Sequence, residues 1–334
     1  MTIATVTLNA AIDKTYYLDR FELGRVNRAR DMNAIPGGKG LNVARVVHTF
    51  GRPVVATGIV SGNNGRFILD ELRKAGIEHD FLELDAGESR LCLNMIAADG
   101  VSTELLEAGP TMDETHARQA LALVERMAAR ARVVCLSGSL PRGLPASLYA
   151  DMIGAIRAQG ALPFLDTSGP ALREGIAAAP YALKPNEDEI RLLLPQSNAD
   201  DGSAGGNAAA AAVARASGAE DFVGEAAVVD RIRRLMDQGV VFPVVTLGAQ
   251  GAVAGFGGRI YRVTAPVVQA VNPVGCGDAF VAGLAIAVAE DEPPERCLRF
   301  ATAVAAANAL TPWAGFVEPD DVERLLPLVR VEAS

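Results

Sequence analysis

The chain has 334 residues, of which half are hydrophobic and 5% aromatic, and its formal net charge at pH 7 is −9. Its 31 basic residues form no dense tract and are outnumbered by 40 acidic ones, so we expect neither nucleic acid nor a membrane surface as a partner. No apolar run has the length and freedom from charge of a membrane span, and the N-terminus lacks a signal-peptide pattern, so the protein is predicted to be cytoplasmic.

Short apolar runs recur along the chain and predict strands that are buried on both faces. Helix-period stretches separate most of them; residues 41–51 and 114–131 are two examples. This alternation predicts an α/β fold with three layers, α/β/α, in which helices cover both faces of a mostly parallel sheet. The predicted strands are residues 2–8, 54–60, 132–138, 162–166, 181–184 and 243–248.

Two segments, about 12–36 and 88–108, break this alternation. The second contains an Asp-Gly pair at residues 99–100, which predicts a hairpin turn because such turns need a positive φ. We expect the two segments to form a small β-sheet lid with a half-polar face toward a ligand. The residues on that face of the first hairpin strand are Arg90, Cys92 and Asn94.

The lid segments are expected to be inserted in a single domain that spans residues 1–334. Residues 197–226 are rich in Ala and Gly and predict a low-complexity insertion at the surface. The four cysteines have no metal-binding spacing and are predicted to be reduced, buried thiols.

The sequence Gly275-Cys276-Gly277-Asp278 opens an almost entirely apolar helical stretch. Its glycines let backbone N–H groups converge on one point, and the positive end of the helix adds to the attraction for an anion. A phosphoryl group in transfer carries such negative charge. Asp278 is either a general base beside this site or simply a cap for the helix.

Residues 35–51 contain a second glycine-rich turn, with Gly37, Gly38 and Gly40 before a helix. Lys39 and Asn42 are three residues apart and can face one ligand. The segment lacks the P-loop pattern, so it is either a ligand-binding turn of another kind or a plain glycine-rich turn.

Residues 181–190 place Lys184 at the end of a buried strand, followed by Asn186 and Glu189. Ligands bind at this edge of open α/β sheets, and a carboxylate there can hold Mg²⁺ through water. The alternative is that Asn186 and Glu189 only begin a helix.

Residues 244–255 continue a strand into a turn that contains Thr246, Gly248 and Gly251. This pattern is typical of a turn that holds nucleotide phosphates, and equally of an ordinary hairpin.

Taken in order, these four motifs resemble the ribokinase (PfkB) superfamily of carbohydrate kinases. Residues 37–42 are similar to its first signature, and residues 272–283 to its second, except for Cys276, where Ala or Gly is usual. The opening segment, with Asp13 and the Asn27-Arg28 pair, resembles the branch of 1-phosphofructokinase and tagatose-6-phosphate kinase, as does Lys39 within GGKGLNVAR.

The resemblance implies a ribokinase-like fold and ATP-dependent phosphorylation of a hexose monophosphate to the bisphosphate. The implied substrate is fructose 1-phosphate, tagatose 6-phosphate or fructose 6-phosphate. ATP and Mg²⁺ are the implied cofactors, with K⁺ as a further candidate, and a homodimer through the lid is expected. Two alternatives stay open: a kinase of a free sugar or nucleoside, and a non-catalytic sugar-phosphate-binding protein.

The resemblance also assigns roles to residues. It makes Asp278 the catalytic base, beside an anion hole formed by Gly275, Cys276 and Gly277. It makes Lys39 and Arg90 the groups that hold the phosphate already on the substrate. The implied substrate-binding residues are Asp13, Arg28, Gly37, Gly38, Lys39, Asn42, Arg90 and Ser139. The implied nucleotide-binding residues are Lys184, Asn186, Thr246, Gly248, Gly251 and Asn308, with Glu189 at the metal.

Overall fold

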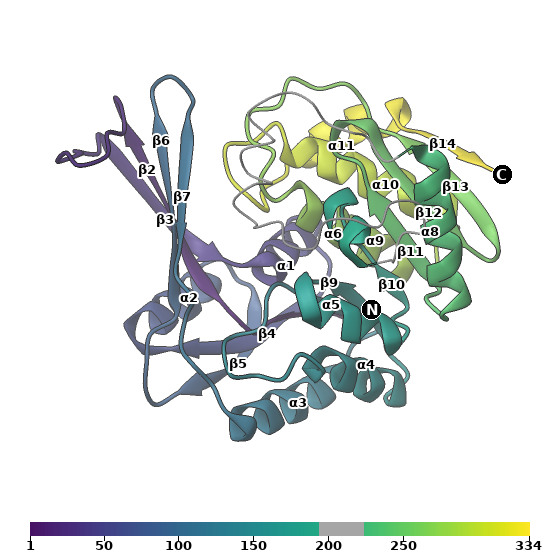
Figure 1. Ribbon diagram of the computed structural model, residues 1–334, viewed down its shortest axis with the longest axis horizontal. Helices are drawn as coiled ribbons and strands as arrows, with labels where there is room; N and C mark the ends of the chain where they lie inside the picture. The colour runs from purple at the N-terminus through teal and green to yellow at the C-terminus, as the bar shows by residue number, and fades with distance from the viewer. Residues whose placement is uncertain (194–223) are drawn as a thin grey trace, which may run out of the picture.

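The computed structural model describes residues 1–193 and 224–334. Most of the predicted insertion 197–226 therefore lies outside the described residues. Its last two residues belong to a helix that begins at Glu225. Figure 1 shows a large sheet flanked by helices and a second, smaller sheet that extends away from it.

The main sheet has ten strands within the described residues, in the order β14-β13-β12-β11-β10-β9-β8-β1-β4-β5. Neighbours from β11 to β5 pair in parallel, and β12, β13 and β14 add antiparallel pairs at one edge. All six predicted strands are present. The strands are β1 (Ile3–Thr7), β4 (Val54–Ser61), β5 (Glu78–Leu84), β8 (Val133–Ser137), β9 (Leu162–Asp166), β10 (Ala182–Leu183), β11 (Phe242–Thr246), β12 (Gly251–Phe256), β13 (Arg259–Thr264) and β14 (Arg330–Ala333).

Two apolar cores, one on each face of the sheet, show which helices cover it. The predicted three-layer α/β/α fold is confirmed. The first face carries α1 (Lys39–Thr49), α2 (Gly62–Lys74), α9 (Cys276–Ala289), α10 (Pro294–Asn308) and α11 (Pro319–Leu325). The second carries α3 (Glu114–Ala128), α4 (Leu148–Ala158), α5 (Gly169–Ala177), α6 (Glu187–Leu193) and α8 (Glu225–Asp237).

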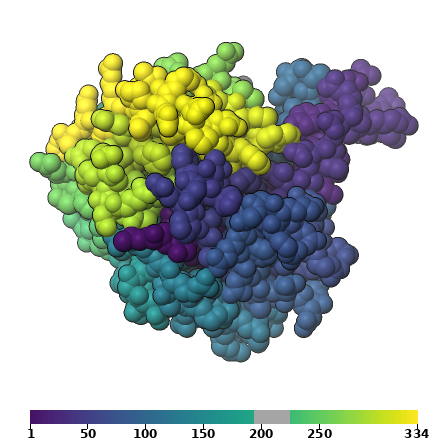
Figure 2. Space-filling view, turned by 180° about the vertical axis from the view of Figure 1, so that it is seen from behind, coloured from purple at the N-terminus to yellow at the C-terminus, as the bar shows by residue number. Residues whose placement is uncertain are grey.

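The small sheet has the order β3-β2-β6-β7 and is built from the two segments that broke the strand–helix alternation. The predicted hairpin at residues 99–100 is confirmed, since Gly100 has a φ of 85° between two antiparallel strands. Figure 2 shows, from behind, that this lid projects from one corner of the molecule. Its strands are β2 (Ala11–Leu18), β3 (Asp31–Gly37), β6 (Arg90–Ala97) and β7 (Ser102–Leu106).

Helix α9 is buried along its length from Asp278 to Ala289, which explains its apolar sequence. It packs closely on α10: a Cβ atom added at Gly283 would lie 2.8 Å from the Cα of Ala301. Among the described helices, α9 included, none is both long and apolar enough to cross a membrane. This packing against α10 therefore determines the position of the N-terminus of α9, which carries Asp278.

We expect Gly283→Ala to destabilise the protein by about 1–3 kcal/mol, because α9 and α10 must separate to admit the methyl group. Gly154→Ala is the matched control: it lies in α4 with no atom near the added Cβ, and should be neutral or stabilising by up to about 1 kcal/mol. Urea unfolding measures both variants. Equal stability of Gly283→Ala and the wild type would contradict the close packing.

Candidate active site

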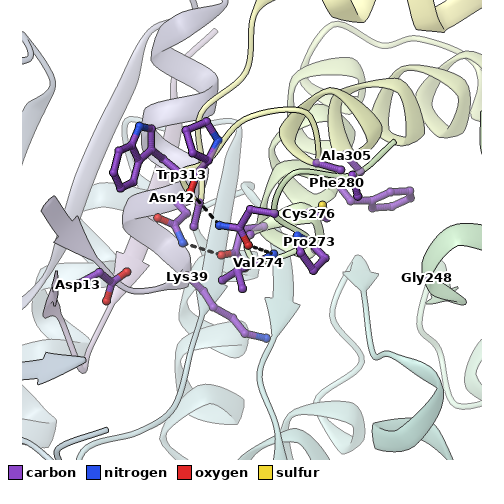
Figure 3. Close-up of a pocket in the computed structure, with 18 of the residues that line it drawn as sticks. Asp13, Lys39, Asn42, Gly248, Pro273, Val274, Cys276, Phe280, Ala305 and Trp313 are labelled. Carbon is purple, nitrogen blue, oxygen red and sulfur yellow. Dashed lines mark hydrogen bonds between the residues drawn. The ribbon is translucent and has the colours of Figure 1, made fainter. Parts of the chain in front are cut away.

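A cavity of about 810 Å³ lies between the lid and the carboxyl ends of the parallel strands. Figure 3 shows Asp13 at its lid end, Lys39, Asn42 and Cys276 in the middle and Gly248 at the far end. Most of the predicted site residues line it. They are Asp13, Gly38, Lys39, Asn42, Arg90, Lys184, Asn186, Thr246, Gly248, Gly251, Gly275, Cys276, Gly277 and Asp278.

The turn before α9 has the geometry of an anion-binding site. Gly275 is the N-cap of the helix and adopts a left-handed conformation, with φ of 86°. A Cβ atom there would lie 2.8 Å from the Cα of Ala314, so glycine is required on both counts. The N-terminus of α9 therefore turns its first-turn amides and its helix dipole toward the cavity, and the N–H of Cys276 also donates to the oxygen of Pro273 at 3.4 Å.

Asp278 lies in this first turn but does not cap the helix, because α9 has no side-chain cap. Its carboxyl is 7% exposed, and its Oδ2 accepts a hydrogen bond of 2.8 Å from Nδ2 of Asn42. Burial and the negative charge of Asp166 raise the pKa of Asp278 to about 6, although Lys39, Asn42 and Lys184 act in the opposite direction. A carboxylate that titrates near neutral pH suits a general base better than a cap.

Asp166, which the sequence analysis missed, is the counter-charge of the site. It ends β9, is 1% exposed, and lies 2.9 Å from the ammonium of Lys39 and 3.4 Å from that of Lys184. Burial opposes its ionisation, but Lys184 and Lys39 outweigh burial and hold the pKa of Asp166 below its usual value. A carboxylate that ends a buried strand at the ligand-binding edge of the sheet was the available signal.

The lid end of the cavity is built around Asp13. A Cβ atom at Gly37 would lie 2.1 Å from Cγ of Asp13, so Gly37 makes room for this carboxylate and does not line the cavity itself. Burial raises the pKa of Asp13, against the effects of Arg45, Arg90 and a hydrogen bond with the Cys92 thiol. The half-buried carboxylate is placed to accept hydrogen bonds from hydroxyl groups of a ligand.

Arg90 is held at the root of the lid by two carbonyl groups. Its Nε donates to the oxygen of Asn9 at 3.2 Å, and its Nη1 donates to that of Glu107 at 3.5 Å. Arg90 stabilises the charge of Asp13, whereas Lys39 stabilises the charges of Asp166 and Asp278. The two cations predicted to share one phosphate therefore act on different carboxylates.

The far end of the cavity contains residues from the two remaining predicted motifs, residues 181–190 and 244–255. Asn186 and Glu189 cap α6 reciprocally: the backbone N–H of Asn186 donates to Oε2 of Glu189 at 2.9 Å, and that of Glu189 donates to Oδ1 of Asn186 at 2.7 Å. Asn186 still lines the cavity, but Glu189 does not. Thr246 and Gly251 belong to the antiparallel hairpin of β11 and β12, whose turn also lines the cavity.

Three further predicted residues lie outside the cavity lining. Asn308 is fully buried and holds the loops: its Nδ2 donates to the oxygen of Val274 at 3.0 Å, and its Oδ1 accepts from the N–H of Gly315 at 2.8 Å. Ser139 accepts a hydrogen bond of 3.3 Å from the Asn9 side chain. Arg28 is exposed in the connection between β2 and β3.

The cysteine prediction needs one correction. All four thiols are free, as expected, but only Cys135 and Cys297 are buried. Cys92 and Cys276 are half-buried because both lie on the cavity wall.

An α/β sheet with a helix N-terminus at the cavity, a carboxyl group with a raised pKa and two nearby lysines has the features of a phosphoryl-transfer site. Comparison with known proteins identifies its class. Residues 6–321 match the model of the pfkB family of carbohydrate kinases. The chain is 32% identical, over 98% of its length and 99% of the relative's, to a tagatose-6-phosphate kinase of Staphylococcus epidermidis.

Solved structures agree on the fold. Phosphofructokinase-2 from Escherichia coli in complex with fructose-6-phosphate superposes with a TM-score of 0.82 at 23% identity, and its complex with potassium with a TM-score of 0.84 at 23% identity; each match covers 98% of both chains. The chain belongs to the pfkB family and is a carbohydrate kinase.

Asp278 can accept a proton only when ionised, so kcat/KM should fall about tenfold per unit as the pH drops below about 6. Asp166→Asn removes the negative charge that raises this pKa, and should therefore move the fall in kcat/KM to lower pH. The substrates' phosphate groups titrate in the same range but identically for both enzymes, so the difference between the profiles belongs to the protein. Superimposable profiles would contradict the electrostatic link between the two carboxyls.

Proposed function

We propose that the protein transfers the terminal phosphoryl group of ATP to a hydroxyl of a hexose monophosphate and forms a hexose bisphosphate. The observation that carries the proposal is one cavity with Asp278 beside an anion-binding turn and Arg90, an anchored cation, near Asp13. The relative named tagatose-6-phosphate kinase, similar over nearly the whole chain, supports it.

In the proposed step, Asp278 takes the proton of the attacking hydroxyl through Oδ1, since Oδ2 is occupied by Asn42. The hydroxyl oxygen forms the new bond to phosphorus, and the bridging oxygen leaves with ADP. The amides of Gly275, Cys276 and Gly277 stabilise charge on the transferred group. Cys276 supplies its backbone N–H, as any residue would, in exchange for the 3.4 Å hydrogen bond that this group donates to the oxygen of Pro273.

Lys39 takes a different role from the one that the sequence implied. Its ammonium pairs with Asp166, which also pairs with Lys184, and the ammonium of Lys184 would be 3.3 Å from a Cβ atom at Gly277, in the first turn of α9. We assign both lysines to the phosphoryl group in transfer and leave the substrate's own phosphate to Arg90. Positive charge next to the transferred group stabilises the negative charge on its oxygens in the transition state.

ATP fits the far end of the cavity, where the β11–β12 turn and the half-exposed Val274 offer backbone groups and apolar surface. The described residues contain no cluster of three or more metal-ligating side chains. We therefore propose that Mg²⁺ is held by phosphate oxygens and water, with Glu189 acting through water, as this ion prefers. Dependence on K⁺ and a cytoplasmic location stay predictions.

A panel of substrates tests the function. With MgATP we expect turnover of at least one of fructose 1-phosphate, fructose 6-phosphate and tagatose 6-phosphate, with little of fructose or adenosine. Asp278→Asn should lower kcat by at least about a hundredfold. Rapid turnover of a free sugar or nucleoside would favour the first alternative, and sugar-phosphate binding without any turnover the second.

The same panel includes Arg90→Ala, which should raise KM for the hexose monophosphate by about 10- to 100-fold and leave KM for ATP within about threefold, because one charged hydrogen-bond donor to phosphate is lost. Arg118→Ala is the matched control, since Arg118 is exposed on α3 and paired only with residues of its own helix. Equal effects of Arg90→Ala on both KM values would remove the assignment of Arg90 to the sugar phosphate.

The lid supports the proposal of a homodimer. It exposes the apolar side chains of Met32, Val101 and Leu105, which are 48%, 60% and 55% accessible, and such a face gains from pairing with its copy. In sedimentation velocity we expect a dimer, and Leu105→Asp should shift it toward the monomer, whereas Val241→Asp, at an exposed site before β11, should not. A monomeric wild-type protein would contradict this assembly.

A further inference from the structure

Arg45 lies one turn after Asn42 in α1 and makes an unusually complete set of contacts. Its Nη1 donates to Oδ1 of Asn42 at 3.0 Å and to the oxygen of Ala314 at 3.0 Å, and its Nη2 donates to the oxygen of Pro36 at 2.7 Å. The guanidinium lies 4.7 Å from the centroid of the Phe316 ring. The rigid, planar fork of an arginine matches this set, and the single ammonium of a lysine does not.

The contact with Arg45 decides which way the Asn42 amide faces. An amide side chain has an accepting oxygen and a donating NH₂ group that a flip exchanges. Because Arg45 donates to Oδ1, the NH₂ group faces Asp278, where Nδ2 donates to Oδ2 at 2.8 Å. The flipped amide would set its oxygen against the carboxylate and its NH₂ against the guanidinium, and both contacts would be repulsive.

Arg45 also holds the loop behind the anion-binding turn. A Cβ atom at Gly275 would lie 2.8 Å from the Cα of Ala314, the residue whose carbonyl Arg45 binds. A Cβ atom at Gly315 would lie 2.9 Å from Nη1 of Arg45 itself. The loop from Ala314 to Phe316 is thus packed between α1 and the start of α9, and Arg45 is a polar attachment for it on the α1 side, as Asn308 is through Gly315.

We infer that Arg45 is a positioning residue for the phosphoryl transfer: it fixes the Asn42 amide as a donor to Asp278 and ties the loop behind Gly275 to the same helix. The inference rests on the proposed function, since it concerns the base of that reaction. Arg45 does not itself line the cavity, so it acts through Asn42 and Ala314, which do.

Several charged groups face Asp278 and must be held constant in a test. They are Asp166 at the end of β9, Lys39 at the start of α1 and Lys184 after β10, with Asn42 as the neutral donor; Arg45 in turn faces both Asp13 and Asp278. Loss of the Asn42 donation removes stabilisation of the ionised carboxylate, so the pKa of Asp278 should rise.

Arg45→Lys keeps the positive charge but loses the fork. We expect kcat to fall about 10- to 100-fold, both KM values to stay within about threefold, and the acidic fall in kcat/KM to move up by about one pH unit.

Arg45→Gln, which loses the charge but can still donate to Asn42, should keep the pH profile closer to that of the wild type and replaces Arg45→Lys if that variant does not fold. Arg52→Lys, an exposed pair with Glu290, is the matched control and should change none of these values.

A double variant separates action through Asn42 from a simple charge effect. Asn42→Ala should shift the pH profile, and Arg45→Lys added to it should shift it no further. A full additional shift, or a wild-type profile for Arg45→Lys alone, would overturn the inference.

A second readout does not need turnover. In ¹³C NMR of the protein with labelled aspartate, the Asp278 carboxyl, assigned with Asp278→Asn, should titrate at higher pH in Arg45→Lys than in the wild type. An enzyme inactive on every sugar phosphate would remove the proposed function, whereas an unchanged Asp278 titration would remove the inference about Arg45.

Discussion

The charge balance around one buried carboxylate, Asp166, is the constraint on which the candidate active site depends. Lys39 and Lys184 both extend to the point where a phosphoryl group would pass, and two unpaired ammonium groups there would repel each other and lose their hydration. Asp166 satisfies both and is held in place as the last residue of a strand in the main sheet. Its negative charge also raises the pKa of Asp278, so one group both pairs with the two lysines and sets the pH at which Asp278 titrates.

Close backbone contacts determine where Asp278 lies relative to the cluster of Asp166, Lys39 and Lys184. Helix α9 is buried from Asp278 to Ala289 and packs closely against α10 at Gly283. Its N-cap, Gly275, packs equally closely against Ala314 in the loop. The lid contacts the same loop, since the ring of Tyr17 meets that of Trp313 edge to face at 6.4 Å. The part of the cavity that would hold the sugar and the part that would hold the transferred phosphoryl group are therefore linked through residues 313–316.

Features that depend on a short sequence pattern were predictable from the sequence, whereas features that depend on a partner far away in the chain were not. Buried strands such as β1 and β8 were predictable because strands covered on both faces are apolar throughout. The role of Asp166 was not predictable from the strand that it ends, because its partners Lys39 and Lys184 are 127 and 18 residues away in the chain. Arg45 lies within the predicted helical stretch 41–51, whose sequence has no sign that residues 314–316 cover this side chain.

By itself, the sequence determined the layer architecture, the two lid segments and the glycine-rich turns, because each depends on local periodicity or on residues within one turn. Only the tertiary structure decided which carboxylate each lysine pairs with and that Asp278 does not cap α9. Both depend on which side chains the sheet brings within hydrogen-bond distance. Such distances follow from packing of segments far apart in the chain, and electrostatic effects between buried groups depend steeply on them.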